Sequence, residues 1–128
     1  MTHSRPADEV VVYKICDQAE WSAASTQQTY AGNTDDLRDG FIHLSALHQL
    51  AGTLARHFAS RQDLVLIAVA VSKLGQNLRW EASRGGDQFP HLYAPLPLAA
   101  ALKAWPITLG GDGVHQLPEL TSLEQRRA

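Results

Sequence analysis

The chain has 128 residues, of which 45% are hydrophobic, and this is enough for one compact domain with a buried core. Its 11 Lys and Arg residues against 13 Asp and Glu residues give a formal net charge of -2, which excludes the broad positive field that holds long stretches of DNA. With a single cysteine and no apolar run long enough to cross a bilayer, we expect a cytoplasmic protein that binds neither DNA nor a membrane.

The first elements expected along the chain are a strand and a helix. Residues 1–9 are polar and lack periodicity, so we expect a disordered N-terminus, and residues 10–15 are β-branched and aromatic, which favours a strand. Asp17 and Glu20 have the spacing of a capping box, with Asp17 as the N-cap of a helix over residues 17–28.

The middle of the chain is expected to contain a loop, a short strand and a second helix. Residues 30–40 have turn-forming composition throughout, and residues 41–44 form a brief apolar strand. Ser45 is the expected N-cap of a helix over residues 46–59, because apolar side chains recur there at spacings of three and four: Leu47, Leu50, Leu54 and Phe58.

The second half of the chain reads mainly as strands. Residues 64–71 form a continuous apolar run, which predicts a central strand covered on both faces. The turn-forming residues after it predict a hairpin to a strand over residues 78–82. A last strand is expected over residues 101–109, where Pro106 favours an edge position.

These elements predict a small single α+β domain with two main helices. We expect the domain to cover residues 10–109, and residues 110–128 to form a weakly ordered C-terminal tail.

The strand that carries His43 supplies the first candidate site residues. His43 and Ser45 point to the same face, because side chains alternate along a strand. An imidazole beside a hydroxyl can hydrogen-bond a sugar diol or a phosphate oxygen, and can transfer protons. The alternative is a buried histidine that is satisfied by a backbone carbonyl.

Trp80, Glu81 and Arg84 supply a second group. Glu81 can stabilise positive charge or act as a base, and the alternative is a surface glutamate paired with Arg79 or Arg84. Arg84 precedes two glycines and suits phosphate oxygens, unless this is a plain hairpin loop. Trp80 is either a core aromatic residue or a platform on which a base stacks.

His91 and Tyr93 lie in the rigid segment FPHLY, where they alternate to one side and form one wall. We expect His43, Glu81, His91 and Tyr93 to line a common cleft. A metal site built from two histidines and Glu81 is an alternative, but no short-range ligand spacing supports it, so we expect no metal.

Several segments, in order and with similar spacing over residues 10 to about 109, resemble the domain of unknown function family 952. They are YKI at residues 13–15, DGFIHLS at 39–45, LVLIAV at 64–69, LRWEASRGG at 78–86 and FPHLYAPL at 89–96. The resemblance implies an ADP-ribosyltransferase-like fold, with a split antiparallel or mixed sheet around an NAD-binding cleft. The strand GFIHLS is also similar to a strand of RNA 2'-phosphotransferases, which use NAD to accept a phosphate.

The resemblance implies a nucleotide-type ligand, namely NAD, ADP-ribose or a phosphorylated ribose, with NAD as co-substrate if a reaction takes place. The catalytic residues would then be His43, Glu81 and His91, and the substrate-binding residues would be Lys14, Ser45, Trp80, Arg84 and Tyr93.

Two functions remain open at this stage. The first is an NAD-dependent transferase, in which Glu81 stabilises a charged centre of the oxocarbenium type. The second is a non-catalytic module that binds a metabolite or a peptide in the same cleft. Lys14 stands where related sequences often have histidine, and no diagnostic glutamate motif is present, which are arguments for the second function. The clustered His, Ser, Glu, Arg and Tyr residues lead us to expect a cleft for a nucleotide-type ligand, with ADP-ribosyl-transfer-like chemistry as its possible reaction, and to keep the second function as the alternative.

Overall fold

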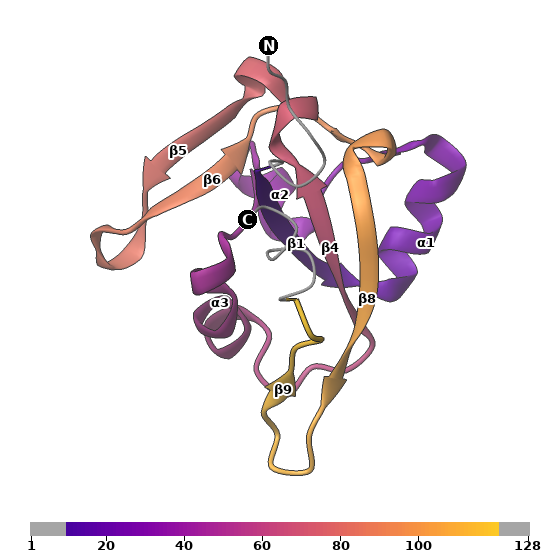
Figure 1. Cartoon of the computed structure of the whole chain (residues 1–128), viewed down its shortest axis with the longest axis vertical. Helices are drawn as coiled ribbons and strands as arrows, with labels where there is room; N and C mark the ends of the chain where they lie inside the picture. The colour runs from indigo at the N-terminus through magenta and orange to yellow at the C-terminus, as the bar shows by residue number, and fades with distance from the viewer. Residues whose placement is uncertain (1–9, 121–128) are drawn as a thin grey trace.

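The computed structural model describes residues 10–120, which form a small α+β domain with antiparallel sheets and few helices (Figure 1). Its helices are α1 (Gln18–Gln27), α2 (Thr34–Asp39) and α3 (Leu50–His57). Its strands are β1 (Val11–Asp17), β2 (Thr29–Tyr30), β3 (Ile42–His43), β4 (Leu64–Ala70), β5 (Leu78–Ala82), β6 (Gln88–Leu92), β7 (Leu96–Pro97), β8 (Ala101–Leu109) and β9 (His115–Gln116).

The described strands form three antiparallel sheets. The largest has the order β1-β4-β8-β9, the second pairs β2 with β7, and the third has the order β3-β6-β5. A two-way bridge between Tyr13 and Ser45, with N–H···O distances of 2.8 Å in both directions, links β1 to the segment that follows β3. The third sheet is therefore attached to the first strand of the largest one.

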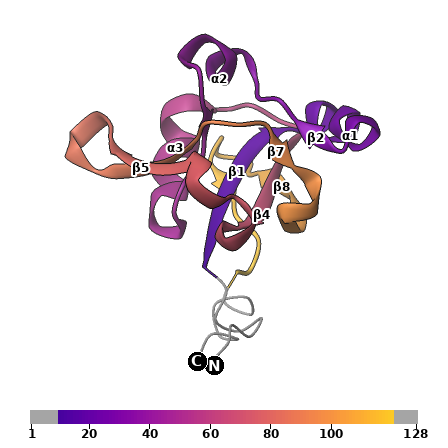
Figure 2. The ribbon, with the colours of Figure 1, turned by 90° about the horizontal axis from the view of Figure 1, so that it is seen from above.

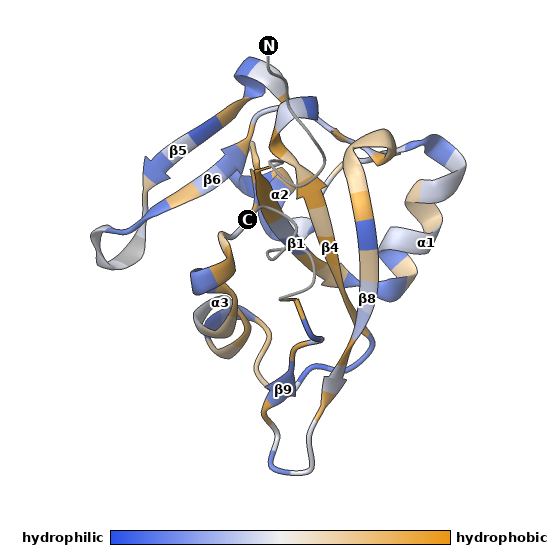
Figure 3. Ribbon diagram, viewed as in Figure 1, coloured by the Kyte–Doolittle hydropathy of each residue, from blue (hydrophilic) through white to orange (hydrophobic). Residues whose placement is uncertain are grey.

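The predicted central strand is confirmed as β4, which is buried along its whole length between β1 and β8. Its alternate side chains enter two different cores: Leu64 and Leu66 pack on the side of α3, whereas Val65 and Ile67 pack in a core that includes Ala24 of α1. Both faces are covered, which explains why the strand lacks a polar alternation. Figure 3 shows the apolar colour concentrated on β1 and β4.

The two predicted helices are confirmed, but their predicted caps are wrong. Asp17 stands at the N-cap of α1 without a side-chain cap bond, and accepts a hydrogen bond from Arg61 at 2.6 Å instead. Ser45 does not cap the second helix, because its hydroxyl contacts the Thr53 hydroxyl at 2.9 Å. That helix begins as a 3-10 turn at Leu47–Gln49 and continues as α3, and Leu47, predicted to be buried, is exposed.

The predicted loop over residues 30–40 is wrong, because this segment contains α2. The Asn33 side chain accepts a hydrogen bond from the Asp36 N–H, and the Asp36 carboxylate accepts one from the Asn33 N–H, both at 2.9 Å. This capping box starts the helix, and Gly40 ends it in the left-handed conformation with φ of 87°.

The predicted hairpin between the central strand and β5 is also wrong. Two 3-10 turns, Val71–Lys73 and Gly75–Asn77, carry the chain into the third sheet, where β5 pairs with β6. Figures 1 and 2 show this β5–β6 hairpin projecting from the body of the molecule on the side opposite α1. The hairpin forms one side of the candidate site.

The strand predicted over residues 101–109 is confirmed as β8, and Pro106 lies on the part of it that pairs only with β4 among the described strands. β9 pairs with its last two residues, Thr108 and Leu109, and Leu120 is buried in the core beside α3. Residues 110–120, which we expected to be weakly ordered, therefore contribute a strand and a core side chain. Residues 1–9 and 121–128 lie outside the described residues.

Candidate functional site

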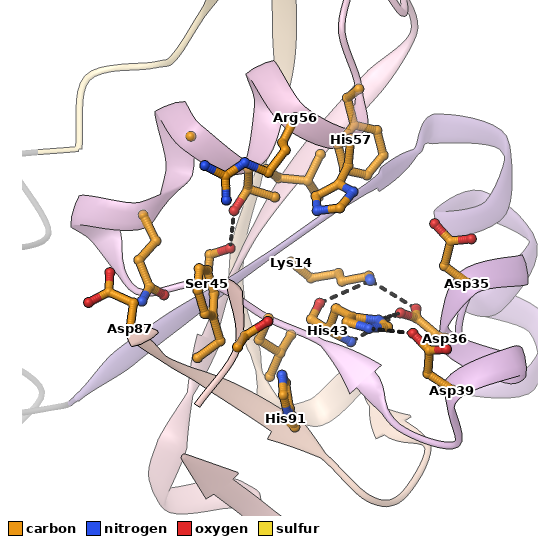
Figure 4. A pocket seen from close by; sticks show the side chains of 18 of the residues that line it. Lys14, Asp35, Asp36, Asp39, His43, Ser45, Arg56, His57, Asp87 and His91 are labelled. Atoms are coloured by element: carbon orange, nitrogen blue, oxygen red, sulfur yellow. Dashed lines mark hydrogen bonds and ion pairs between the residues drawn. The ribbon is translucent and has the colours of Figure 1, made fainter. Parts of the chain in front are cut away.

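A cleft of about 520 Å³ lies between α2, β3, α3 and the β5–β6 hairpin. Side chains from segments far apart in the sequence meet in it, as Figure 4 shows for ten labelled residues. Four predicted site residues line the cleft: Lys14, His43, Ser45 and His91. Strand pairing explains why the two histidines lie together, because the register of β3 on β6 places His43 directly opposite His91.

The Asp36 carboxylate is the polar centre of one wall. It is buried, with a side chain only 1% exposed, and Oδ2 accepts a hydrogen bond from Lys14 Nζ at 2.8 Å. Oδ1 contacts the His43 N–H at 3.0 Å and His43 Nδ1 at 2.6 Å. Lys14 Nζ also donates to the His43 carbonyl at 3.0 Å. A single carboxylate thus joins β1, α2 and β3.

The charge state of Asp36 follows from these contacts. Burial alone would raise the pKa of this carboxyl, but the hydrogen bonds from His43 and the positive charge and hydrogen bond of Lys14 outweigh it and lower the pKa from 3.8 to about 2. Lys14 is therefore a buried ion-pair partner of Asp36. It is not the free substrate-binding group that the sequence had predicted.

His43 lies at the cleft with both ring nitrogens facing carboxylates. Nδ1 contacts Asp36 at 2.6 Å and Nε2 contacts Asp39 at 3.0 Å. A carboxylate can only accept hydrogen bonds, so both contacts are made together when both nitrogens carry protons. A ligand can reach a His43 nitrogen only by displacing Asp39, and this limits the direct catalytic role predicted for His43.

His91 forms the floor of the cleft and is connected to the hairpin. Its Nδ1 lies 2.7 Å from Glu81 Oε1, and the Tyr93 hydroxyl donates to the same oxygen at 2.7 Å. The hydrogen bonds from His91 and Tyr93 lower the pKa of Glu81. The Phe41 ring stacks on the His91 ring at a centroid distance of 4.0 Å, and the His43 and His91 centroids lie 5.8 Å apart.

The opposite wall belongs to α3. Arg56 and Thr53 line the cleft from this helix, and Figure 4 shows Arg56 and His57 on the side opposite His91. Arg56 is exposed and has no ion-pair partner among residues 10–120. Sequence reasoning missed this residue because an arginine on the polar face of a helix is common and gives no signal of its own.

Three more predicted residues, Glu81, Tyr93 and Trp80, are not among the described residues that line the cleft. Glu81 and Tyr93 lie behind His91 and act on the cleft only through it. Trp80 is 43% exposed on β5 and is neither a core residue nor one of the described cleft residues. Arg84 belongs to the turn between β5 and β6, and its side chain lies outside the described part of the structure.

The sequence contains a pattern that could have placed two acidic cleft residues, Asp36 and Asp39, in a helix. The Asn33–Asp36 spacing is that of a capping box, and it identifies a helix start in a segment that otherwise resembles a loop. The role of Asp36 beyond the cap depends on Lys14, 22 residues away, which no local pattern indicates. Once this helix is predicted, Asp39 is expected on the same face as Asp36, because it lies about one helical turn later.

Residues 10–120 were also compared with two other kinds of structure, a metal site and a membrane-spanning helix. In that range no group of three or more His, Cys, Asp and Glu side chains is arranged to hold a metal ion. No helix within the same range is long and apolar enough to span a membrane.

Comparison with known proteins identifies a family. The chain is similar to the protein CC0527 from Caulobacter crescentus, whose crystal structure is 45% identical with a TM-score of 0.82, over 91% of this chain and 99% of that one. The solution NMR structure of CC0527 is 46% identical with a TM-score of 0.73, over 88% and 94% of the two chains. No curated protein matches the chain. The family model described as "Protein of unknown function (DUF952)" matches residues 15–104, so the chain belongs to the DUF952 family.

Proposed function

We propose that the cleft binds a nucleotide-type ligand that carries both phosphate and ribose, such as ADP-ribose or NAD. The observation that carries this proposal is the division of charge between its walls. On the α2 wall the Asp39 carboxylate is paired with Arg38 and His43, whereas on the α3 wall Arg56 presents a guanidinium with no ion-pair partner among the described residues. Carboxylates accept hydrogen bonds from sugar hydroxyls, and the arginine fork matches phosphate oxygens.

The size and the uncharged groups of the cleft support the same ligand class. A volume of about 520 Å³ falls within the range of about 300–1,000 Å³ that small-molecule sites occupy. The hydroxyls of Ser45, which follows β3, and of Thr53, on the α3 wall, contact each other at 2.9 Å, so they add neutral donors and acceptors to the cleft. Phe89 supplies an apolar surface at the hairpin.

The position of Glu81 favours binding over ADP-ribosyl transfer. A carboxylate that stabilises an oxocarbenium-like centre must approach the reacting carbon, whereas Glu81 is bonded to His91 and Tyr93 outside the cleft lining. The family resemblance to ADP-ribosyltransferases remains the argument for NAD as co-substrate. A non-catalytic module that binds a nucleotide-type metabolite is the form of the proposal that agrees best with the placement of Glu81.

Isothermal titration calorimetry with ADP-ribose, NAD and adenosine tests the proposal. We expect Arg56→Ala to weaken ADP-ribose binding at least tenfold, which is about 1.4 kcal/mol, and to change adenosine binding little because adenosine lacks phosphate. Lys73→Ala is the matched control, since it removes one exposed positive charge from a residue outside the cleft lining. ADP-ribose that fails to bind at millimolar concentration, or binds Arg56→Ala as well as wild type, contradicts the proposal.

An NAD-consumption assay separates the two forms of the proposal. A binding module leaves NAD intact. Turnover that disappears in both His91→Ala and Glu81→Ala, with circular dichroism unchanged, assigns the transferase form instead.

A further inference from the structure

The contact between Glu81 and His91 determines which nitrogen of the His91 ring carries the proton. Glu81 Oε1 lies 2.7 Å from His91 Nδ1 and also accepts a hydrogen bond from the Tyr93 hydroxyl at 2.7 Å. These hydrogen bonds lower the pKa of Glu81, so at neutral pH it is a carboxylate that can only accept. His91 Nδ1 must therefore be the donor.

The other ring nitrogen faces the cleft. His91 Nε2 has no hydrogen-bond partner among residues 10–120, and no buried side-chain nitrogen or oxygen in that range lacks a partner, so Nε2 is accessible from the cleft. The ring cannot easily turn away, because Phe41 stacks on it at 4.0 Å and only 6% of the residue is exposed. In a neutral imidazole with a protonated Nδ1, Nε2 carries a lone pair.

We propose that Glu81 is a positioning residue that holds His91 in the Nδ1–H tautomer, which makes His91 Nε2 a hydrogen-bond acceptor for a hydroxyl or amino group of the ligand. The Tyr93 hydroxyl donates a second hydrogen bond to the same Glu81 oxygen, but the tautomer depends only on the contact between Glu81 and His91. The choice of ligand rests on the proposed function, but the tautomer does not. His91 complements Arg56 and Asp39, because it selects a ligand donor at a third point of the cleft.

The tautomer can be read without a ligand by two-bond 1H–15N correlation NMR of the whole chain. Spectra are recorded at about pH 8.5, roughly two units above the ordinary imidazole pKa. His115 serves as an internal reference of the opposite kind, because its Nε2 lies 2.8 Å from the Arg61 carbonyl and must donate to it. His91→Gln identifies the His91 signals by their absence.

We expect the Nδ1–H pattern for His91 in the wild type and the Nε2–H pattern for His115. Glu81→Leu, which removes the acceptor at similar volume, should shift His91 toward the Nε2–H tautomer that free histidine prefers. Tyr93→Phe is the matched control on the same hairpin, since it leaves Glu81 facing His91 and should preserve the Nδ1–H pattern. Unchanged His115 signals show that each variant is folded.

Two results overturn the inference: a wild-type His91 whose Nε2 is protonated at this pH, or an Nδ1–H pattern that persists in Glu81→Leu. Addition of ADP-ribose then separates this inference from the proposed function. If ADP-ribose fails to bind while the tautomer responds to Glu81→Leu, the positioning role stands and the choice of ligand is wrong. If ADP-ribose binds without moving the His91 Nε2 signal, the acceptor role is wrong and the proposed function stands.

Discussion

Replacing Asp36 by asparagine keeps the shape of the side chain and removes its charge, which tests the centre of the α2 wall. In the wild type the carboxylate accepts hydrogen bonds from Lys14 Nζ, from the N–H groups of Asn33 and His43, and from the His43 ring. In Asp36→Asn, the amide group can accept through only one atom, and Lys14 stays buried at 2% exposure without a negative partner.

The expected loss follows from two independent magnitudes. The pKa of Asp36 falls from 3.8 to about 2, and a shift of this size corresponds to about 2.5 kcal/mol. Removal of one partner from a buried ion pair costs about 3–5 kcal/mol in other proteins. The Asp36 side chain is 1% exposed, so solvent screening does not reduce this value. We expect Asp36→Asn to lower the free energy of unfolding by about 3 kcal/mol.

Urea unfolding followed by tryptophan fluorescence measures this loss. The matched control is Asp35→Asn, where the carboxylate pairs with Arg38 and is 56% exposed, and it should cost less than about 1 kcal/mol. Because the folded pKa of Asp36 is depressed, its contribution is complete above pH 3.8 and is lost as the pH falls through about 2. A loss below about 1 kcal/mol in Asp36→Asn, or an equal loss in both variants, refutes the reasoning.

Further predictions concern backbone conformation and thiol chemistry. Gly32→Ala should lower the free energy of unfolding by more than about 1 kcal/mol, because its φ is +110° and an added Cβ would lie 2.7 Å from Asp36 Cβ. Gly52→Ala, in α3 with open space around the position, should instead raise it by about 0.5–1 kcal/mol in the same urea experiment; a loss would contradict the geometry. Burial raises the pKa of Cys16 to about 12, so a thiol-specific reagent at neutral pH should modify it only after denaturant is added, and rapid modification of the folded protein would disprove this.

The fold could be predicted where local pattern and tertiary packing agree. The strands β4 and β1 could be predicted because a continuous apolar run and a β-branched segment have few alternatives. The buried face of α3 could be predicted from the spacing of Leu50 and Leu54. α2 was missed because its polar residues resemble a loop. Its capping box was visible in the sequence, but the helix has only six residues, and the buried contact of Asp36 with Lys14 is tertiary.

The candidate site could be predicted in part for the same reason. The sequence predicted that His43 and His91 line one cleft, and the structure places them opposite each other on β3 and β6, with both in the cleft lining. The sequence analysis counted Lys14 among the substrate-binding residues, because a lysine in a strand gives no indication that a carboxylate 22 residues away will pair with it. Arg56 was missed because exposure and the absence of a partner are properties of the fold rather than of the sequence.

The two walls of the cleft differ in how strongly their residues contribute to the stability of the fold. The Asp36 carboxylate bonds to residues of three segments of the fold, so a substitution of Asp36 lowers the free energy of unfolding. Thr53 and Arg56 on α3 contribute less to the stability of the fold, because α3 packs on the core through Leu50 and Leu54 on its other face. Among members of the family, we therefore expect the cleft residues on α3 to vary more than Asp36.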